Sequence, residues 1–341
     1  MTDAPPPARV ARLHGWRDLR LHDEPVPVAT ADEVLLRVTA VGLCGSDLHW
    51  YREGAIGDTE LEAPLVLGHE FAGVIVGGPR DGERVAVDPA APCEQCELCR
   101  SGRGRLCPTM RFAGVAPTDG ALRTWMTWPA SRCISLPDAI AAPEATLLEV
   151  LGIALHAIDL AGIEPGMTAG VYGCGPVGLV LIRALRAVGI ARIIATDRLT
   201  HRVTAADDSG ATTSVLAADG LDPAAAIPVD VAFECAGEDA ALDTAVRAVG
   251  PGGRVLLVGI PEGDRYVFPA SPARRKELNL QLVRRMEAPD LPRAIDLVAS
   301  GAVSLGGLVS HRFGLEAAPE AFQKLVSRAG LKVVVEPEGA R

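Results

Sequence analysis

The stretch TAGVYGCGPVGLVLIRALRAVG, residues 168–189, decides the fold of this 341-residue chain. It places Gly173, Gly175 and Gly178 in the pattern G-x-G-x-x-G, between a buried-strand candidate and a helical segment. The segment ARIIATD then predicts a second strand, which ends at Asp197. In such a unit the first glycine permits a tight turn, the second lets the backbone approach a pyrophosphate, and the third lets the helix pack on the strand. The sequence therefore predicts a dinucleotide-binding β-α-β unit.

The same unit indicates which nucleotide binds. We expect phosphate at the N-terminus of the helix, where Pro176 and Val177 complete the cofactor-binding segment, because free N–H groups and the helix dipole favour anions there. The carboxylate of Asp197 can accept hydrogen bonds from both ribose hydroxyls and would repel a 2′-phosphate, which favours NAD over NADP. Arg198 follows it, and an arginine can hold a 2′-phosphate, so NADP stays open as the second choice.

Outward from this unit, the two halves of the chain differ in texture. Strand-like segments such as VDVAFECAG and GGRVLLVG alternate with segments of helical length in the second half, which predicts a parallel sheet. Short alternating or β-branched runs broken by Gly, Pro and Asp extend from Ala8 to about Val87 and predict a mostly β region of strands and turns. The fold class is therefore α/β with two domains, which also suits the length.

The charge balance and hydropathy exclude several partners. The net charge is −10, and lysines and arginines are scattered rather than clustered, which argues against nucleic acid and anionic membrane surfaces. The first residues carry prolines and charges where a signal peptide would be apolar, and no run approaches the roughly 18 apolar residues of a membrane span. We expect a soluble, cytoplasmic protein that acts on a small molecule.

Four cysteines gather in CEQCELCRSGRGRLC, residues 93–107, at the spacing C-x2-C-x2-C-x7-C. Disulfide frameworks are typical of small secreted domains, so metal ligation is the better interpretation in a large chain. Four thiolates close a tetrahedral zinc shell, which makes such a site structural. Buried thiols, one short disulfide and an iron–sulfur cluster are the alternatives. The predicted ligands are Cys93, Cys96, Cys99 and Cys107.

A second group of metal-ligating residues precedes this loop. Cys44 lies in VGLCGSDLHWYREGAIGD, and His69 and Glu70 lie in LVLGHEFAGVI. Three such ligands leave one zinc position open for water or substrate, as catalysis requires. Glu149 interrupts the apolar run TLLEVLGIALHA, where a buried carboxylate without a cation would be costly. The sequence therefore predicts a catalytic zinc site in addition to the structural one.

The segments GLCGSDLH, LGHEFAGVI, GERVAVDPAAPCEQCELCRSGRGRLC and DGALRTWM together resemble the zinc-dependent medium-chain dehydrogenases, most closely the sorbitol (polyol) dehydrogenase branch. The resemblance runs from about Asp32 to Val335. It implies a GroES-like catalytic domain of residues 1–152 and 285–341, a Rossmann domain of residues 153–284, and a homodimer or homotetramer.

The resemblance also implies roles for individual residues. Cys44, His69 and Glu70 match the ligands of the catalytic zinc, and Glu149 matches an acid that ligates directly or through water. The four cysteines of the loop match the ligands of the structural zinc. Ser46 and His49 match positions that contact the substrate hydroxyl and relay its proton. The residues that match the substrate pocket are Trp50 or Tyr51, Ile56, and either Arg284 or Arg285.

The expected function is NAD-linked oxidation of a secondary hydroxyl to a ketone by hydride transfer, with two zinc ions per chain and a polyol or sugar alcohol as substrate. One alternative is a zinc dehydrogenase of a simple secondary alcohol or of threonine. Another is a non-catalytic nucleotide-binding protein with a structural zinc loop. The intact set of Cys44, His69 and Glu70 favours the enzyme, because a binder has no use for an open metal site.

Overall fold

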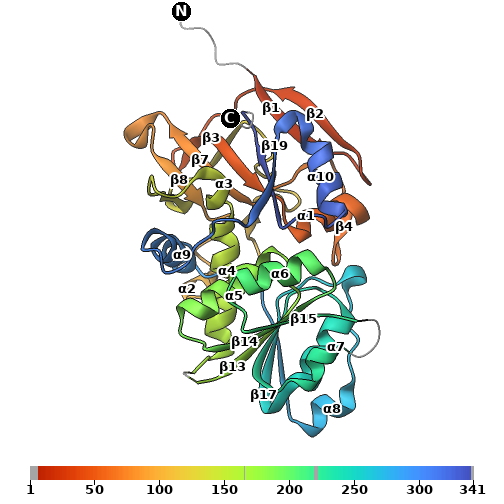
Figure 1. Cartoon of the computed structure of the whole chain (residues 1–341). Helices are drawn as coiled ribbons and strands as arrows, with labels where there is room; N and C mark the ends of the chain where they lie inside the picture. The colour runs from red at the N-terminus through yellow and green to blue at the C-terminus, as the bar shows by residue number, and fades with distance from the viewer. Residues whose placement is uncertain (1–6, 165, 219–221, 339–341) are drawn as a thin grey trace, which may run out of the picture. The chain divides into compact units, whose positions relative to one another are not determined.

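The structure is a computed structural model in which residues 7–164, 166–218 and 222–338 are described (Figure 1). The chain divides into two compact units. The first contains the residues up to Glu149, Glu287–Ala299 and the residues from Leu305 onward. The second contains Val150–Met286 and Ser300–Ser304. Within the described ranges, no helix has the length and apolar character needed to cross a membrane.

The second unit is built on a six-stranded sheet in which every neighbouring pair is parallel. Its strand order is β15-β14-β13-β16-β17-β18. The order reverses between β13 and β16, and ligands of open α/β sheets bind at such a reversal, outside the carboxyl ends of the strands. The strands are β13 (Thr168–Tyr172), β14 (Arg192–Asp197), β15 (Thr213–Leu216), β16 (Val229–Glu234), β17 (Val249–Leu257) and β18 (Asn279–Leu282).

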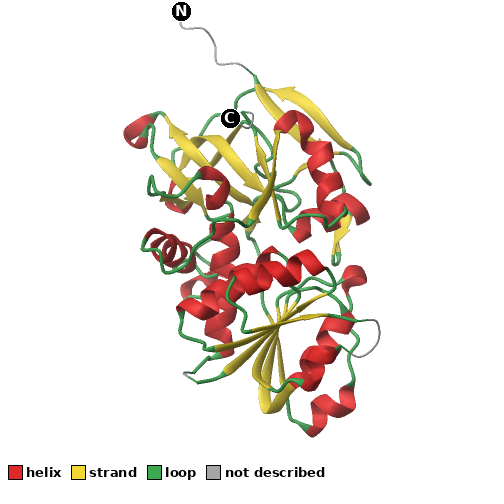
Figure 2. Cartoon of the chain, viewed as in Figure 1, coloured by secondary structure: helices red, strands yellow, loops and turns green. Residues whose placement is uncertain are grey.

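Helices cover both faces of this sheet (Figure 2). Figure 1 shows α5 and α6 on one face and α7 and α8 on the other, as right-handed crossovers in opposite directions require. A Cβ atom at Gly178 would collide with the carbonyl oxygen of Gly173, so only glycine lets α5 pack this closely on the turn. The helices are α5 (Pro176–Ala187), α6 (Thr200–Asp208), α7 (Asp239–Ala248) and α8 (Ala270–Arg275).

The first unit is built on a seven-stranded sheet with the order β12-β8-β7-β3-β20-β19, in which β11 also pairs with β3. A smaller sheet has the order β2-β1-β6. The expected α/β class with a β-rich first domain is therefore confirmed. The strands of the two sheets are β1 (Ala8–Leu13), β2 (Leu19–Glu24), β3 (Glu33–Gly42), β6 (Leu65–Val66), β7 (Glu70–Val76), β8 (Arg84–Val87), β11 (Trp125–Pro129), β12 (Cys133–Ser135), β19 (Val309–Gly314) and β20 (Lys332–Glu336).

One helix of the first unit differs from the sequence prediction of strands and turns up to Val87. Helix α1 spans Gly45–Glu53 and begins at Cys44, where a capping box joins Cys44 to Asp47. It ends at Gly54, whose left-handed backbone (φ 67°) is a common helix stop. The other strands and α-helices of this unit are β4 (Ala55–Ile56), β5 (Thr59–Glu60), β9 (Ala90–Ala91), β10 (Arg111–Phe112), α2 (Glu97–Arg100), α3 (Ala142–Ala145), α9 (Asp290–Ala299) and α10 (Ala318–Val326). Helix α4 (Leu147–Ala161) begins in the first unit, and its residues from Val150 onward belong to the second.

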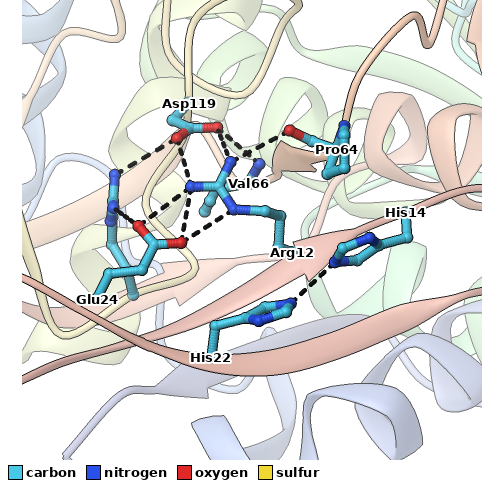
Figure 3. A network of polar contacts seen from close by, with 8 residues as sticks. Arg12, His14, His22, Glu24, Pro64, Val66 and Asp119 are labelled. Atoms are coloured by element: carbon cyan, nitrogen blue, oxygen red, sulfur yellow. Dashed lines mark hydrogen bonds and ion pairs between the residues drawn. The ribbon is translucent and has the colours of Figure 1, made fainter.

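Figure 3 shows a charged network at the small sheet, in which Arg12 of β1 contacts Glu24 of β2 and Asp119. The guanidinium of Arg12 donates to Glu24 and to Asp119, and each of these partners is only partly exposed. Both oxygens of Asp119 accept from Arg12, and Oδ1 also accepts the N–H of Val66 at 2.9 Å. Two residues after Asp119, the N–H of Ala121 donates to the carbonyl of Gly68 at 2.9 Å, and Gly68 directly precedes His69. The network therefore holds the segment that leads into His69 and Glu70.

We predict that Asp119→Ala lowers the free energy of unfolding by about 2 kcal/mol, because it removes charged hydrogen bonds to Arg12 and Val66. Asp119→Asn should lose less, since the amide oxygen can still accept from Val66. Chemical denaturation followed by circular dichroism measures both. Asp138→Ala is the control, because Asp138 pairs with Arg84 from a fully exposed position. Equal stability of Asp119→Ala and Asp138→Ala would contradict the role given to the network.

Candidate functional site

The four cysteines of residues 93–107 converge on one point, with all four sulfur atoms within 4.8 Å of one another. Sγ of Cys96 lies 3.4 Å from Sγ of Cys99 and 4.0 Å from Sγ of Cys107, and Sγ of Cys93 lies 4.0 Å from Sγ of Cys99. A tetrahedron with zinc–sulfur distances of about 2.3 Å has edges of about 3.8 Å. A disulfide would need about 2.05 Å. A multi-iron cluster would need wider spacing, so a single tetrahedral ion fits best.

The electrostatics of this cluster suit a cation. The backbone N–H groups of Gln95 and Cys96 favour the thiolate of Cys93 and lower its pKa to about 6. Desolvation and the hydrogen bond with Cys96 raise the pKa of Cys99 to about 12. A bound cation would favour the thiolate form of Cys99, which its surroundings in the protein disfavour.

The second predicted group also comes together, inside the first unit. Donor atoms of Cys44, His69 and Glu70 all lie within 4.8 Å of one another. Cys44 precedes α1, and the His69–Glu70 pair stands at the start of β7. Three protein ligands with mixed sulfur, nitrogen and oxygen atoms match a zinc site that keeps one position open.

A residue that the sequence interpretation did not assign orients this group. The Asp47 side chain is 0% exposed, and its carboxylate accepts the N–H of Cys44 at 2.9 Å and of Gly68 at 3.1 Å. Its Oδ1 lies 3.7 Å from Nδ1 of His69. Burial opposes the imidazolium, but Asp47 raises the pKa of His69 well above its usual value. The three-residue spacing from Cys44, typical of a capping box, was the signal that could have identified it.

Glu149 places a further buried carboxyl group near Cys44, His69 and Glu70. It is 3% exposed, and its Oε2 has no hydrogen-bond partner. Burial raises its pKa to about 8, the charge of His69 opposes this, and the charge of Glu70 adds to it. A buried carboxylate atom without a partner fits the predicted need for a cation at this position.

The two residues assigned to proton transfer lie on α1, three positions apart on one helix face. Oγ of Ser46 lies 3.4 Å from Nε2 of His69, which puts the hydroxyl beside the ligand group. Nδ1 of His49 lies 2.6 Å from Oε1 of Glu53, an interaction that the sequence did not indicate. The carboxylate of Glu53 favours the tautomer with the proton on Nδ1, which leaves Nε2 of His49 as an acceptor.

The predicted substrate residues occupy different surroundings. Trp50 and Tyr51 are buried in the hydrophobic core of the first unit, and the Tyr51 ring lies 4.7 Å from that of Phe322. Ile56 is half-buried against the same core. Arg284 is exposed and Arg285 half-buried in the second unit. The substrate contacts of all five residues remain predictions.

In the second unit, the predicted nucleotide residues meet at the turn after β13. The two oxygens of Asp197 accept the N–H groups of Cys174 and Leu199, at 2.8 and 2.9 Å. Arg202 was not predicted, yet its Nη1 lies 3.9 Å from Asp197 and 3.6 Å from a Cβ built at Gly175. A guanidinium beside the glycine turn adds positive charge where phosphate is expected.

Arg198, the residue considered for a 2′-phosphate, has a 65% exposed side chain that pairs with Glu238 at 3.8 Å.

Comparison with known proteins shows the family to which the chain belongs. Residues 30–138 match the alcohol dehydrogenase GroES-like domain, and residues 176–300 match the zinc-binding dehydrogenase family. The chain is 36% identical to sorbitol dehydrogenase of Bacillus subtilis, over 96% of this chain and 97% of that protein. The chain belongs to the zinc-dependent medium-chain dehydrogenases. It is accordingly an oxidoreductase that acts on CH–OH groups, and its similarity is to the polyol dehydrogenase branch.

Two further relatives agree with this placement. Sorbitol dehydrogenase of Bos taurus is 36% identical over 95% of this chain and 94% of that protein. The solved structure of L-idonate 5-dehydrogenase from Escherichia coli superposes with a TM-score of 0.87 at 26% identity, over 96% of this chain and 98% of that chain. The resemblance inferred from the sequence motifs is thus confirmed.

We predict that Cys99→Ser loses one zinc per chain and unfolds at a lower temperature, because the loop of residues 93–107 then lacks a closed metal site. Cys133→Ser is the control, since Cys133 is buried outside both groups. Metal content by mass spectrometry and thermal unfolding measure the two effects. Wild-type zinc content in Cys99→Ser would contradict the structural site.

Proposed function

We propose that this chain is an NAD-linked polyol dehydrogenase that oxidises a secondary hydroxyl to a ketone at a zinc ion. The observation that supports it is the group of Cys44, His69 and Glu70, which can hold a metal with one position open, in a chain that also has a G-x-G-x-x-G turn. Similarity to sorbitol dehydrogenases supports a polyol as the substrate class.

The proposed cofactors supply the chemistry that protein side chains lack. Zinc held by Cys44, His69 and Glu70 would act as a Lewis acid and make the substrate hydroxyl more acidic. The nicotinamide ring would accept the hydride from the same carbon. Asp47 keeps His69 oriented toward the metal position, as outer carboxylates of metal-binding histidines do. Glu149 contributes a further carboxylate, as a ligand or through water.

Ser46 and His49 would move the proton that the substrate hydroxyl loses. The hydroxyl of Ser46 can accept this proton and pass one on, because a hydroxyl is both donor and acceptor. His49 can then take the proton on Nε2, since Glu53 holds the proton already on Nδ1. In this proposal the proton lost by the substrate hydroxyl leaves by way of Ser46 and then His49, two side chains of α1.

Two other functions are less well supported: oxidation of a different alcohol, and nucleotide binding without catalysis. A simple secondary alcohol or threonine would use the same metal group and differ in the pocket. A non-catalytic binder is disfavoured, because nothing in nucleotide binding requires Cys44, His69 and Glu70 to converge. Two zinc ions per chain and a homodimer or homotetramer complete the proposal.

We predict that a panel of polyols, secondary alcohols and threonine gives NADH formation fastest with a polyol. Cys44→Ser should fold and bind NAD but lose turnover by at least about 100-fold. Replacing a residue that only hydrogen-bonds a metal ligand already lowers activity by about 10- to 100-fold, and Cys44 is proposed as a ligand itself. Steady-state rates and NAD binding by fluorescence measure this, with Cys133→Ser as the control. Near-normal turnover of Cys44→Ser would contradict the mechanism, and a preference for threonine would contradict the substrate class.

We also predict that wild-type protein prefers NAD, and that Asp197→Ala shifts the ratio of kcat/KM toward NADP by at least about ten-fold. One charge within a few ångströms of a 2′-phosphate costs more than about 1.4 kcal/mol, which corresponds to that factor. Arg198→Ala is the matched variant and should leave the NAD rate unchanged. A comparable kcat/KM for both cofactors in the wild type would contradict the assignment of NAD.

A further inference from the structure

Lys332 is the most deeply buried cationic side chain among the described residues, at 1% exposure. It is the first residue of β20 and lies far in sequence from Cys44, His69 and Glu70. Its Nζ nevertheless forms an ion pair with Oε2 of Glu70. The same Nζ donates to the carbonyl of Leu43 at 3.0 Å. Leu43 is the residue before Cys44. One ammonium group therefore contacts both segments that carry ligands of the proposed catalytic zinc.

The strand order and register of the first unit's sheet bring Lys332 and Glu70 together. Strand β3 lies between β7 and β20, and Gly42 of β3 is opposite Glu70 on one side and Val334 on the other. A Cβ at Gly42 would collide with Oε2 of Glu70 and would lie 2.7 Å from Cε of Lys332. Glycine thus leaves the space through which the two side chains meet across the central strand.

We propose that Lys332 is a positioning residue that restricts how Glu70 ligates the catalytic zinc. The ammonium engages Oε2, so Glu70 offers the metal Oε1 alone and with a reduced share of its negative charge. A carboxylate held in this way would be a weak, single-atom ligand, which would help to leave one position of a bound metal open for an alcohol. This inference rests on the catalytic zinc site of the proposed function.

A purely structural role for Lys332 makes a different prediction. A residue that only pairs a buried charge should change stability when it is replaced, and any loss of order should weaken metal binding. A residue that competes with the metal for Glu70 should have the opposite effect on affinity. Without Lys332, both carboxylate oxygens and the full charge are available to the ion.

The test measures binding of Zn²⁺ and Co²⁺ to the metal-free full-length chain by competition with a chromophoric chelator, without NAD or alcohol. Cys44→Ser, which retains the four-cysteine site, provides the signal to subtract. We expect Lys332→Met to bind metal at the catalytic site at least about ten-fold more tightly. Its Co²⁺ form should absorb more weakly in the visible range, as added oxygen ligation produces. Lys332→Arg should resemble the wild type.

Two comparisons tie the effect to Glu70. Lys276→Met is the matched control, because Lys276 caps backbone carbonyls in the second unit, including that of Val249 at 2.8 Å. It should leave metal affinity unchanged. In a Glu70→Gln background, Lys332→Met should no longer raise affinity. Lys332→Gln replaces Lys332→Met if the latter fails to fold, since its amide can still donate to Leu43.

Unchanged or weaker metal binding in the Lys332 variant, or an equal gain in the Glu70→Gln background, would overturn the proposal. Because the readout is metal binding, a chain that shows the expected affinities but oxidises no alcohol would contradict the proposed function and leave the role of Lys332 standing.

Discussion

The ion pair between Glu70 and Lys332 joins three neighbouring strands at the centre of the first unit. Both side chains are 1% exposed, and a buried charge is tolerated only when it is paired and hydrogen-bonded. The pair therefore constrains what surrounds it: Gly42 must lack a side chain, and β20 must return from the end of the chain to lie beside β3. Strand β20 thus places Lys332 beside the predicted group of Cys44, His69 and Glu70.

The same principle of compensated charge organises both predicted metal groups in different ways. Four cysteines form a shell of sulfurs with no outside partner required, so that site is self-contained and closed. The group of Cys44, His69 and Glu70 instead depends on Asp47 behind His69 and on Lys332 behind Glu70. A site that must remain open to a substrate has fewer ligands to orient one another, so more of its geometry comes from surrounding residues.

The second unit shows how one motif specifies a local structure almost completely. Gly178 is required because α5 packs against the carbonyl of Gly173, and the carboxylate of Asp197 binds back to the same turn. The strand, the turn and the helix follow one another directly in the chain, so the spacing of the glycines in the sequence fixes where they lie in the folded turn. Arg202 belongs to this turn as well, but a single arginine on a helix carries no signal in the sequence about what it faces.

From the sequence alone, the two-domain α/β class, the convergence of the four cysteines and the glycine turn could be predicted, because each rests on a local pattern. Cys44, His69 and Glu70 were grouped instead by ligand chemistry and by the family resemblance, since Cys44 and His69 lie 25 residues apart. Helix α1 was missed, since its nine residues have a weak apolar face and follow a run of strands. The partners Glu53 and Arg202 became visible only through contacts in the folded chain. Asp47 had a signal in its capping-box spacing from Cys44, but only the structure shows its approach to His69. Lys332 lies more than 260 residues from Glu70, and only the pairing of β20 with β3 brings its charge to the ligand group. Only the tertiary structure determined these contacts, because the sequence of a strand does not specify which other strand it will lie beside.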